Sequence, residues 1–225
     1  MAYEWLNGLS VPGDNRTITR APWTGPIRGE LRTVATNGHA MAIVPPQDWA
    51  AAGEPKFTAS VEQVLALTDW TPLLTVDVGT LKAWLADTLP PPEAKCSACD
   101  GTGMEKCEAC DGTGEFECSC TECGNEHTSD CEDCKGKGEW ACGACQGHKR
   151  TKHYLRLGRG WFAADKVALV VPHLPDGSAV LYQKNEERQL VIVAGEVTAL
   201  IMPVRMGSVD APQEVRHEFS PAIAA

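Results

Sequence analysis

The middle of the chain carries a ladder of cysteines at regular spacing. All 11 cysteines lie between positions 96 and 145, mostly as C-x-x-C pairs followed by glycines. The stretch CSACDGTGMEKCEACDGTG contains C-x-x-C-D-G-T-G twice, with a period of 11 residues. A C-x-x-C pair lets two thiolates bind one tetrahedral metal ion, and the glycines allow turns that aim backbone N–H groups at sulfur. The ladder therefore predicts metal binding, with zinc as the expected ion.

The 11-residue period runs in two series that meet at a change of frame. The cysteines that open the repeats are Cys96, Cys107, Cys118, Cys120, Cys131 and Cys142. The frame changes in CSCTEC, at the centre of the ladder. Two such series suggest an extended strand pair that folds back on itself, with the centre as its tip.

In such a hairpin the outer cysteine pairs meet each other, and so do the inner pairs. The first zinc would then be held by Cys96, Cys99, Cys142 and Cys145. The second would be held by Cys107, Cys110, Cys131 and Cys134. A third site at the tip would use Cys118, Cys120, Cys123 and His127. His148 is a rival fourth ligand, and a free tip cysteine is a further alternative. We expect two zinc ions and, at the tip, a third.

The predicted zinc sites would have a structural role. Each has four protein ligands and no open position, which is typical of structural rather than catalytic zinc. The only large apolar residues of this stretch are Met104, Phe116 and Trp140. It therefore cannot bury a core and needs cross-links, such as bound metal ions, to stay folded. Structural zinc would supply the missing folding free energy. A redox-active C-x-x-C is the alternative, but a regular ladder is not how single redox motifs are arranged.

The repeated motif resembles the central zinc domain of the DnaJ (Hsp40) chaperone family. The matching stretches are CSACDGTG, CEACDGTG, CEDCKGKG and the degenerate CGACQGHK, about a quarter of the chain. The resemblance implies two zinc ions, with the first motif paired with the fourth and the second with the third. The chain has no J-domain and no HPD signature, so co-chaperone activity is not implied. A chaperone-like or thiol-exchange role is kept as an alternative.

The segments on either side of the ladder have globular patterning. Apolar spacing predicts helices over 57–67 and 76–87 and a helical face within 160–174. Alternating apolar residues predict strands within 16–23 and 29–44, a hairpin of 178–184 with 189–195, and a last strand over 197–204. Residues 207–225 are expected to form a loose tail.

These flanks resemble the bacterial DNA polymerase III beta sliding clamp. The resemblance lies in LRTVATNGHAMAIV (31–44), in GWFAADKVALVVPHL (160–174) and in the closing strands that end with IMPVRM. It implies an α+β fold: a single sliding-clamp-like domain of two helix-plus-antiparallel-sheet halves, interrupted by an extended zinc-stapled β-hairpin insertion. The expected boundaries are 1–94 and 149–206 for the two parts of the clamp-like domain, 95–148 for the insertion and 207–225 for a flexible tail.

The clamp resemblance has consequences for assembly. A bacterial clamp has three such domains in each subunit and closes a ring from two subunits. This chain has sequence for one domain, so encircling DNA would need about six copies or a partner. A homo-oligomer is therefore among the expected states.

Charge and composition narrow the classes of partner. The formal net charge of −10 argues against extensive non-specific binding to nucleic acid. A local basic run, HKRTKHYLRLGRG, keeps DNA binding as an alternative function. The residues that would contact phosphates are Lys149, Arg150, Lys152, Arg156 and Arg159.

Several functional classes lack their sequence signals. No apolar run approaches the roughly 20 residues that span a bilayer, and the N-terminus does not read as a secretory signal. We therefore expect a cytoplasmic protein with no membrane partner. No nucleophile–base pair, phosphate loop or open metal site is recognisable, so we expect no enzyme. His39, in ATNGH, is interpreted as a turn residue.

The leading hypothesis is a non-enzymatic, zinc-binding, clamp-like protein that uses the zinc hairpin for recognition. The hairpin is acidic, and zinc-bound thiolates add negative charge, which suits a protein partner with a basic face. The clamp resemblance implies that this partner belongs to the replication, repair or transcription machinery. A compact clamp-like protein of this kind could be phage-encoded.

Overall fold

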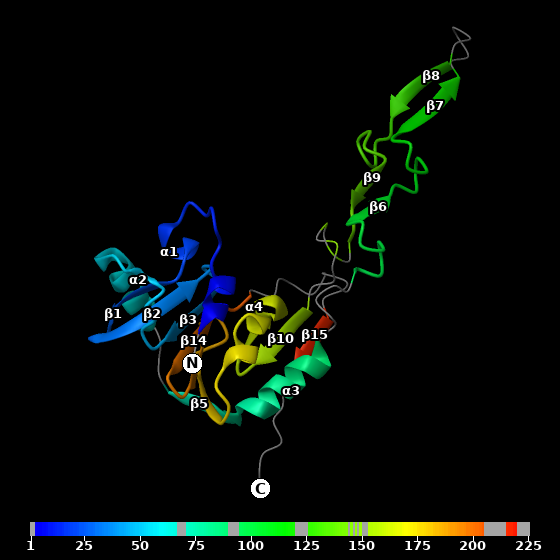
Figure 1. Cartoon of the computed structure of the whole chain (residues 1–225). Helices are drawn as coiled ribbons and strands as arrows, with labels where there is room; N and C mark the ends of the chain where they lie inside the picture. Colours follow the sequence, from blue (N-terminus) through cyan, green and yellow to red (C-terminus); the bar gives the residue numbers. More distant parts are fainter. Residues whose placement is uncertain are drawn as a thin grey trace. The chain divides into compact units, whose positions relative to one another are not determined.

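The structure is a computed structural model that describes residues 3–66, 71–89, 95–119, 126–143, 145, 147, 149, 153–204 and 215–219. Side chains are described for all of these except residues 17, 118, 119, 126, 127, 215 and 216. The chain forms two compact units (Figure 1). Unit 1 comprises Met1–Leu89, His153–Met206 and Arg216–Ala225, and unit 2 comprises Pro90–Lys152 and Gly207–Val215.

The main sheet of unit 1 has eight strands. In spatial order they are β4 (Ala51–Ala52), β1 (Trp23–Ile27), β2 (Glu30–Thr36), β3 (Ala40–Val44), β14 (Val197–Ile201), β13 (Leu190–Ala194), β12 (Ser178–Tyr182) and β5 (Pro72–Asp77). Neighbouring strands are antiparallel except for β1 and β4. The pairing of β3 with β14 joins the segment before unit 2 to the segment after it. One continuous sheet therefore unites both parts of unit 1.

Helices and a smaller sheet complete unit 1. The helices are η1 (Glu4–Leu9), α1 (Thr17–Arg20), α2 (Pro55–Ala66), α3 (Val78–Thr88), α4 (Ala164–Ala168) and η2 (Val171–His173). The smaller sheet has the order β11 (Gly160–Ala163), β10 (His153–Leu157) and β15 (Val215–Glu218). No helix among the described residues is both long enough and apolar enough to cross a membrane.

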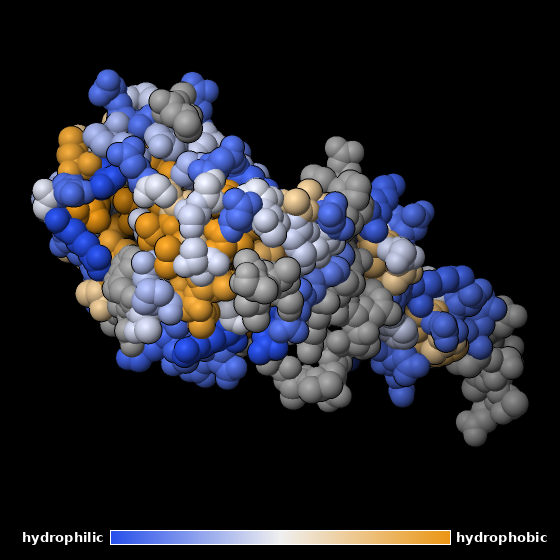
Figure 2. Space-filling view, turned by 90° about the horizontal axis from the view of Figure 1, so that it is seen from below, coloured by the Kyte–Doolittle hydropathy of each residue, from blue (hydrophilic) through white to orange (hydrophobic). Residues whose placement is uncertain are grey.

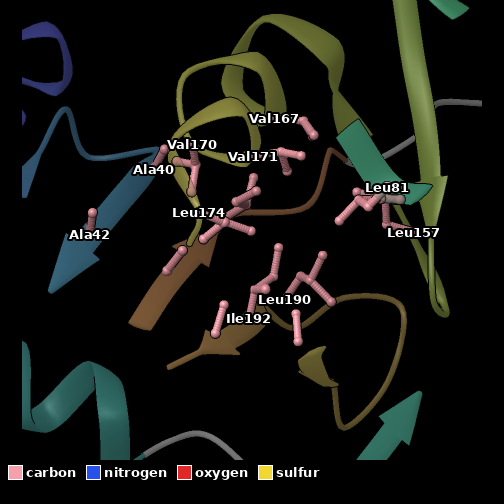
Figure 3. Close-up of a cluster of buried hydrophobic side chains, with 14 of the residues drawn as sticks. Ala40, Ala42, Leu81, Leu157, Val167, Val170, Val171, Leu174, Leu190 and Ile192 are labelled. Atoms are coloured by element: carbon pink, nitrogen blue, oxygen red, sulfur yellow. The ribbon is translucent and has the colours of Figure 1, made fainter. Parts of the chain in front are cut away.

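Strand β13 is buried on both faces and separates two cores. Its sequence, LVIVA, is a continuous apolar run, as expected for a strand covered on both sides. Leu190 and Ile192 face the larger core, which includes Leu81 of α3 and Val171 of η2 (Figure 3). Val191 faces a smaller core on the other side of the sheet. The alternation along one strand thus fixes which elements cover which face.

Two helices cover these cores because of their spacing and capping. Phe57, Val61 and Leu65 lie four residues apart on α2 and are buried in the smaller core. Helix α3 begins after Asp77, whose carboxylate accepts a hydrogen bond from the backbone N–H of Thr80 at 2.8 Å. Both predicted helices, over 57–67 and 76–87, are confirmed, and so is the α+β class.

At three places the structure has an element of another kind than the one expected from the sequence. Residues Thr17–Arg20 form a short helix rather than a strand. Residues Gly160–Ala163 form β11, so the helical segment after them is limited to α4 and η2. The loose tail expected over 207–225 is wrong for Val215–Glu218, which forms β15. The tail is ordered there because Phe219 is buried in the larger core, and its ring lies edge-on to Trp84 with centroids 5.0 Å apart.

Unit 2 is built on two short antiparallel ribbons. The first pairs β6 (Met104–Lys106) with β9 (Glu139–Ala141), and the second pairs β7 (Glu115–Ser119) with β8 (Glu126–Asp130) (Figure 1). Backbone hydrogen bonds continue the same register between and beyond the ribbons, from Cys107 N to Gly138 O and from Cys96 N to Lys149 O. The two residue numbers of every such pair have the same sum. The two limbs therefore form one hairpin without a change of register.

Candidate metal centres

The outer cysteines of unit 2 form one buried group. Cys96, Cys99, Cys142 and Cys145 come from the two limbs, and their sulfur atoms all lie within 4.8 Å of one another. The Sγ atoms of Cys96 and Cys142 are 4.0 Å apart, and those of Cys99 and Cys145 are 3.7 Å apart. Four sulfurs at about 2.3 Å from one tetrahedral zinc would lie about 3.8 Å from each other. These separations fit a ZnS₄ centre and are far longer than a disulfide bond.

The inner cysteines form a second group of the same kind. It consists of Cys107, Cys110, Cys131 and Cys134, again with all sulfurs within 4.8 Å. The Sγ–Sγ distance is 3.8 Å between Cys107 and Cys131 and 3.7 Å between Cys110 and Cys134. All four side chains are buried. Two buried four-cysteine groups could therefore hold two metal ions, and both have the membership expected from a folded-back ladder.

The glycines of the repeat shape the turn after each C-x-x-C pair. The N–H of Gly103 points at Cys99 Sγ, that of Gly114 at Cys110 Sγ, and that of Gly138 at Cys134 Sγ, each at 3.2 Å. These hydrogen bonds stabilise negative charge on sulfur. The glycine type is required at Gly114, where φ is +81° and a Cβ atom would lie 2.4 Å from the carbonyl oxygen of Gly136.

The thiols within one group differ in acidity. Burial raises the pKa of Cys110. The hydrogen bond from the Gly114 N–H and the neighbouring cysteines lower this pKa by a larger amount, so that it falls to about 6. Cys99 follows the same pattern, with Gly103 as its donor and a pKa of about 6. For Cys131, hydrogen bonding from the Cys134 N–H is outweighed by burial and the Cys134 thiol, which raise the pKa to about 11. Metal binding at the inner group must therefore displace protons from sulfur.

The proposed third site falls mostly outside the described residues. Cys120, Cys123 and the rival ligand His148 are not among them, and the side chains of Cys118 and His127 are not described. The backbone register of β7 and β8 pairs Cys118 with His127. A third zinc site stays a prediction.

The basic run predicted as a DNA contact is partly engaged with the protein itself. Arg156 forms an ion pair with Glu218 at 3.1 Å. Arg159 donates from Nη1 to the carbonyl oxygen of Lys184 at 2.7 Å. Lys149 is exposed. Arg150 and Lys152 lie outside the described residues. The role of these five residues in DNA binding stays a prediction.

His39 occupies the turn between β2 and β3. The side chain of Asn37 accepts hydrogen bonds from the N–H groups of His39 and Ala40, which closes the turn. The carbonyl oxygen of His39 accepts from Met202 N at 2.8 Å, so this turn also holds the end of β14. The histidine is exposed and acts through its backbone, in line with its interpretation as a turn residue.

Solved structures with a similar arrangement are bacterial replication clamps. The polymerase III beta subunit of Caulobacter crescentus matches 90% of this chain and 64% of its own, with 12% identity and a TM-score of 0.42. The chain resembles a DNA polymerase III beta sliding clamp. The subunit from Pseudomonas aeruginosa matches 89% of this chain and 62% of its own at 11% identity and TM-score 0.44. For the Bacillus subtilis clamp the values are 90%, 62%, 10% and 0.44.

These likenesses are distant and cover part of each clamp. This chain spans about three fifths of the length of the clamp chains it matches. No protein-family model matches the sequence, and no curated protein matches it. The clamp likeness is one of fold alone, and what this clamp-like chain binds has to be argued from its own residues. The DnaJ-type identity of the cysteine repeat likewise stays a prediction.

Two features of unit 2 and unit 1 were not anticipated. Phe116 and Trp140 are both exposed, although they are two of the few large apolar residues of the ladder. His153 and His217 face each other between β10 and β15. The exposure of Phe116 and Trp140 could have been inferred from the 11-residue period. This period relates Phe116 to Glu105 and Trp140 to Ser129, and both of these residues are polar. The second depends on a contact between distant segments and left no signal in the sequence.

Proposed function

We propose that the chain is a non-enzymatic, zinc-binding, clamp-like protein whose unit 2 binds a protein partner of the DNA replication, repair or transcription machinery. Zinc at the two four-cysteine groups would have a structural role, because all four ligands of each site come from protein sulfur and no position is left for a substrate. Unit 1 would serve as the scaffold that presents unit 2.

The observation that carries the proposal is the distribution of charge. Residues 96–145 contain 12 of the 30 acidic residues and 3 of the 20 basic residues, a formal charge of −9. The remaining residues hold 18 acidic and 17 basic side chains, which nearly cancel. Hydrophilic residues dominate the visible surface of unit 2 (blue, at the right of Figure 2). Almost the whole net negative charge of the chain, −9 of −10, thus belongs to residues 96–145.

This charge favours a protein partner over nucleic acid. Each zinc ion bound by four thiolates would leave a local charge of −2, which adds to that of the acidic side chains. Such a surface repels phosphates and attracts a basic protein surface, raising the association rate and the selectivity. The engagement of Arg156 and Arg159 in contacts within unit 1 weakens the DNA-binding alternative.

Site-specific crosslinking with the full zinc-loaded chain tests this proposal. A photoreactive residue replaces Thr128, which is exposed on β8, and in a matched control it replaces Thr75, which is exposed on β5 of unit 1. We expect position 128, and not position 75, to crosslink replication, repair or transcription proteins in an extract of the source cell. Competition by unlabelled full chain should remove these products. Crosslinks from position 75 alone, or only to DNA, would overturn the proposal.

Three further parts of the proposal concern context. We place the protein in the cytoplasm, where thiols stay reduced and available to zinc. A homo-oligomer is part of the proposal because the clamp resemblance implies a ring built from several such domains. A phage origin, with action on a host replication machine, rests on the compactness of that domain alone.

A further inference from the structure

Two exposed aromatic residues occupy equivalent positions in the two ribbons of unit 2. On the β6–β9 ribbon Trp140 lies opposite Glu105, and on the β7–β8 ribbon Phe116 lies opposite Ser129. A shift of 11 residues carries Glu105 to Phe116 and Ser129 to Trp140. Each ribbon therefore has one aromatic residue in its corresponding cross-strand pair, contributed by opposite limbs of the hairpin.

These aromatic side chains do not serve a core. The buried clusters of unit 2 among the described residues consist of cysteines alone. Phe116 is 41% exposed and Trp140 is 39% exposed. Each ring is therefore more than half covered and keeps a part of its surface open to a partner. The recurrence in both ribbons indicates one repeated contact rather than a single stray residue.

Both ribbons carry carboxylates in addition to their aromatic residue, and these define the chemistry of a segment that could bind there. Glu105 lies opposite Trp140 and on the same face of its ribbon. Glu115 and Glu117 flank Phe116 in the chain, so their side chains project from the other face of the β7–β8 ribbon. Across the ribbon Glu115 lies opposite Asp130, and like charges in directly opposed positions destabilise a strand pair. No ion pair of Glu115, Glu117 or Asp130 occurs among the described residues. A cationic occupant would relieve this repulsion.

We propose that the two ribbons bind a basic segment of the protein partner, with arginine side chains stacked on Phe116 and Trp140 and the positive charge of the segment balanced by the carboxylates of both ribbon faces. The inference rests on the proposed function and names the surface and chemistry of that contact. A guanidinium group stacks on aromatic rings and pairs with carboxylates through its planar donors. Lysine offers the same charge without the planar stacking group, so the surface should prefer arginine.

The test uses two labelled peptides of equal charge, one alternating arginine with alanine and the other lysine with alanine. Fluorescence anisotropy measures their binding to the full zinc-loaded chain at physiological salt. The arginine peptide should bind more tightly. The double variant Phe116→Ala/Trp140→Ala should lose about tenfold in affinity for it, because two cation–π contacts are removed while the net charge is unchanged. Trp49→Ala, at an exposed tryptophan of unit 1, is the matched control and should bind like the wild type.

Zinc content by native mass spectrometry shows that each variant is folded in unit 2. Equal affinity of the wild type and the double variant would overturn the aromatic contact. If Glu115→Gln/Glu117→Gln then still weakened the peptide, general charge attraction would be the cause, and the proposed function would stand without this inference. Absence of peptide binding together with crosslinks from position 128 would also leave the proposed function intact and refute the arginine site. Tighter binding of duplex DNA than of either peptide would refute both.

Discussion

The Nδ1 atom of His153 lies 3.2 Å from the Nε2 atom of His217, and their rings stack at an angle of 5°. One strand of this contact, β10, follows unit 2, and the other, β15, is near the chain end. A hydrogen bond at this distance needs one ring nitrogen as donor and the other as acceptor, so the two imidazoles cannot both be protonated without losing it. The ion pair of Arg156 and Glu218 lies on the same two strands.

We predict that acid weakens the attachment of β15 through this pair. Burial, and then the facing His217, hold the pKa of His153 below its ordinary value. The unfolded chain therefore binds protons more readily than the folded one, and stability present above a pH of about 6.5 is lost as the pH falls below it. Urea unfolding at pH 7.5 and 5.5 should show a larger loss for the wild type than for His217→Asn.

The comparison of the wild type with His217→Asn separates the effect of the histidine pair from zinc release at low pH, since both proteins have the same cysteines. His39→Asn, at the exposed turn, serves as the control and should keep the pH dependence of the wild type. An identical pH dependence in His217→Asn and the wild type would refute a role for the pair.

Zinc stoichiometry should follow the two cysteine groups independently. Native mass spectrometry of the full chain should show at least two zinc ions, and Cys131→Ser should remove the inner one and spare the outer one. Three zinc ions that fall to two in Cys118→Ser and in His127→Ala would support the tip site. Two zinc ions in the wild type, unchanged in both variants, would eliminate it.

Replacement of Gly114 should damage the inner metal group although no ligand is altered. A Cβ atom at this left-handed position would lie 2.4 Å from Gly136 O, so Gly114→Ala must shift the backbone that donates to Cys110. We expect a loss of about 2 kcal/mol or more, measured as weaker zinc retention against a chelator. Gly143→Ala is the matched change, because its Cβ meets nothing within 4 Å. Similar zinc retention in both variants would contradict the close-approach argument.

The C-terminal strand should depend on one buried ring. Phe219→Ala should lower the free energy of unfolding of unit 1 by about 3 kcal/mol, since it empties a site in the larger core beside Trp84. Glu218→Gln breaks an exposed ion pair with Arg156 and should cost less than about 1 kcal/mol. Thermal unfolding of both variants measures the difference. A small effect of Phe219→Ala would mean that β15 contributes little to the fold.

Local patterns predicted the elements whose signals are local. The spacing of Phe57, Val61 and Leu65 is enough to predict α2, because a helix repeats its buried face every three to four residues. The period of the cysteines likewise predicted groups that the structure brings together, since a hairpin that folds back at the central change of frame pairs outer with outer and inner with inner motifs.

Elements that depend on distant partners were missed. The tail reads as polar apart from a few residues, and β15 forms only because Phe219 meets Trp84 and His217 meets His153, contacts that no local pattern encodes. Strand β11 was read as part of a helix because Phe162 fits both periods in so short a segment. The exposure of Phe116 and Trp140 has a partial signal in the sequence, because the 11-residue period relates them to the polar residues Glu105 and Ser129.

The constant register of unit 2 limits how this hairpin can change in length. A residue inserted into one limb alone would move every later thiol of that limb away from its partners across the ladder. Growth by one metal group requires 11 new residues in each limb at the same level. Such a hairpin is expected to change its length by one complete metal group at a time, with equal insertions or deletions in both limbs.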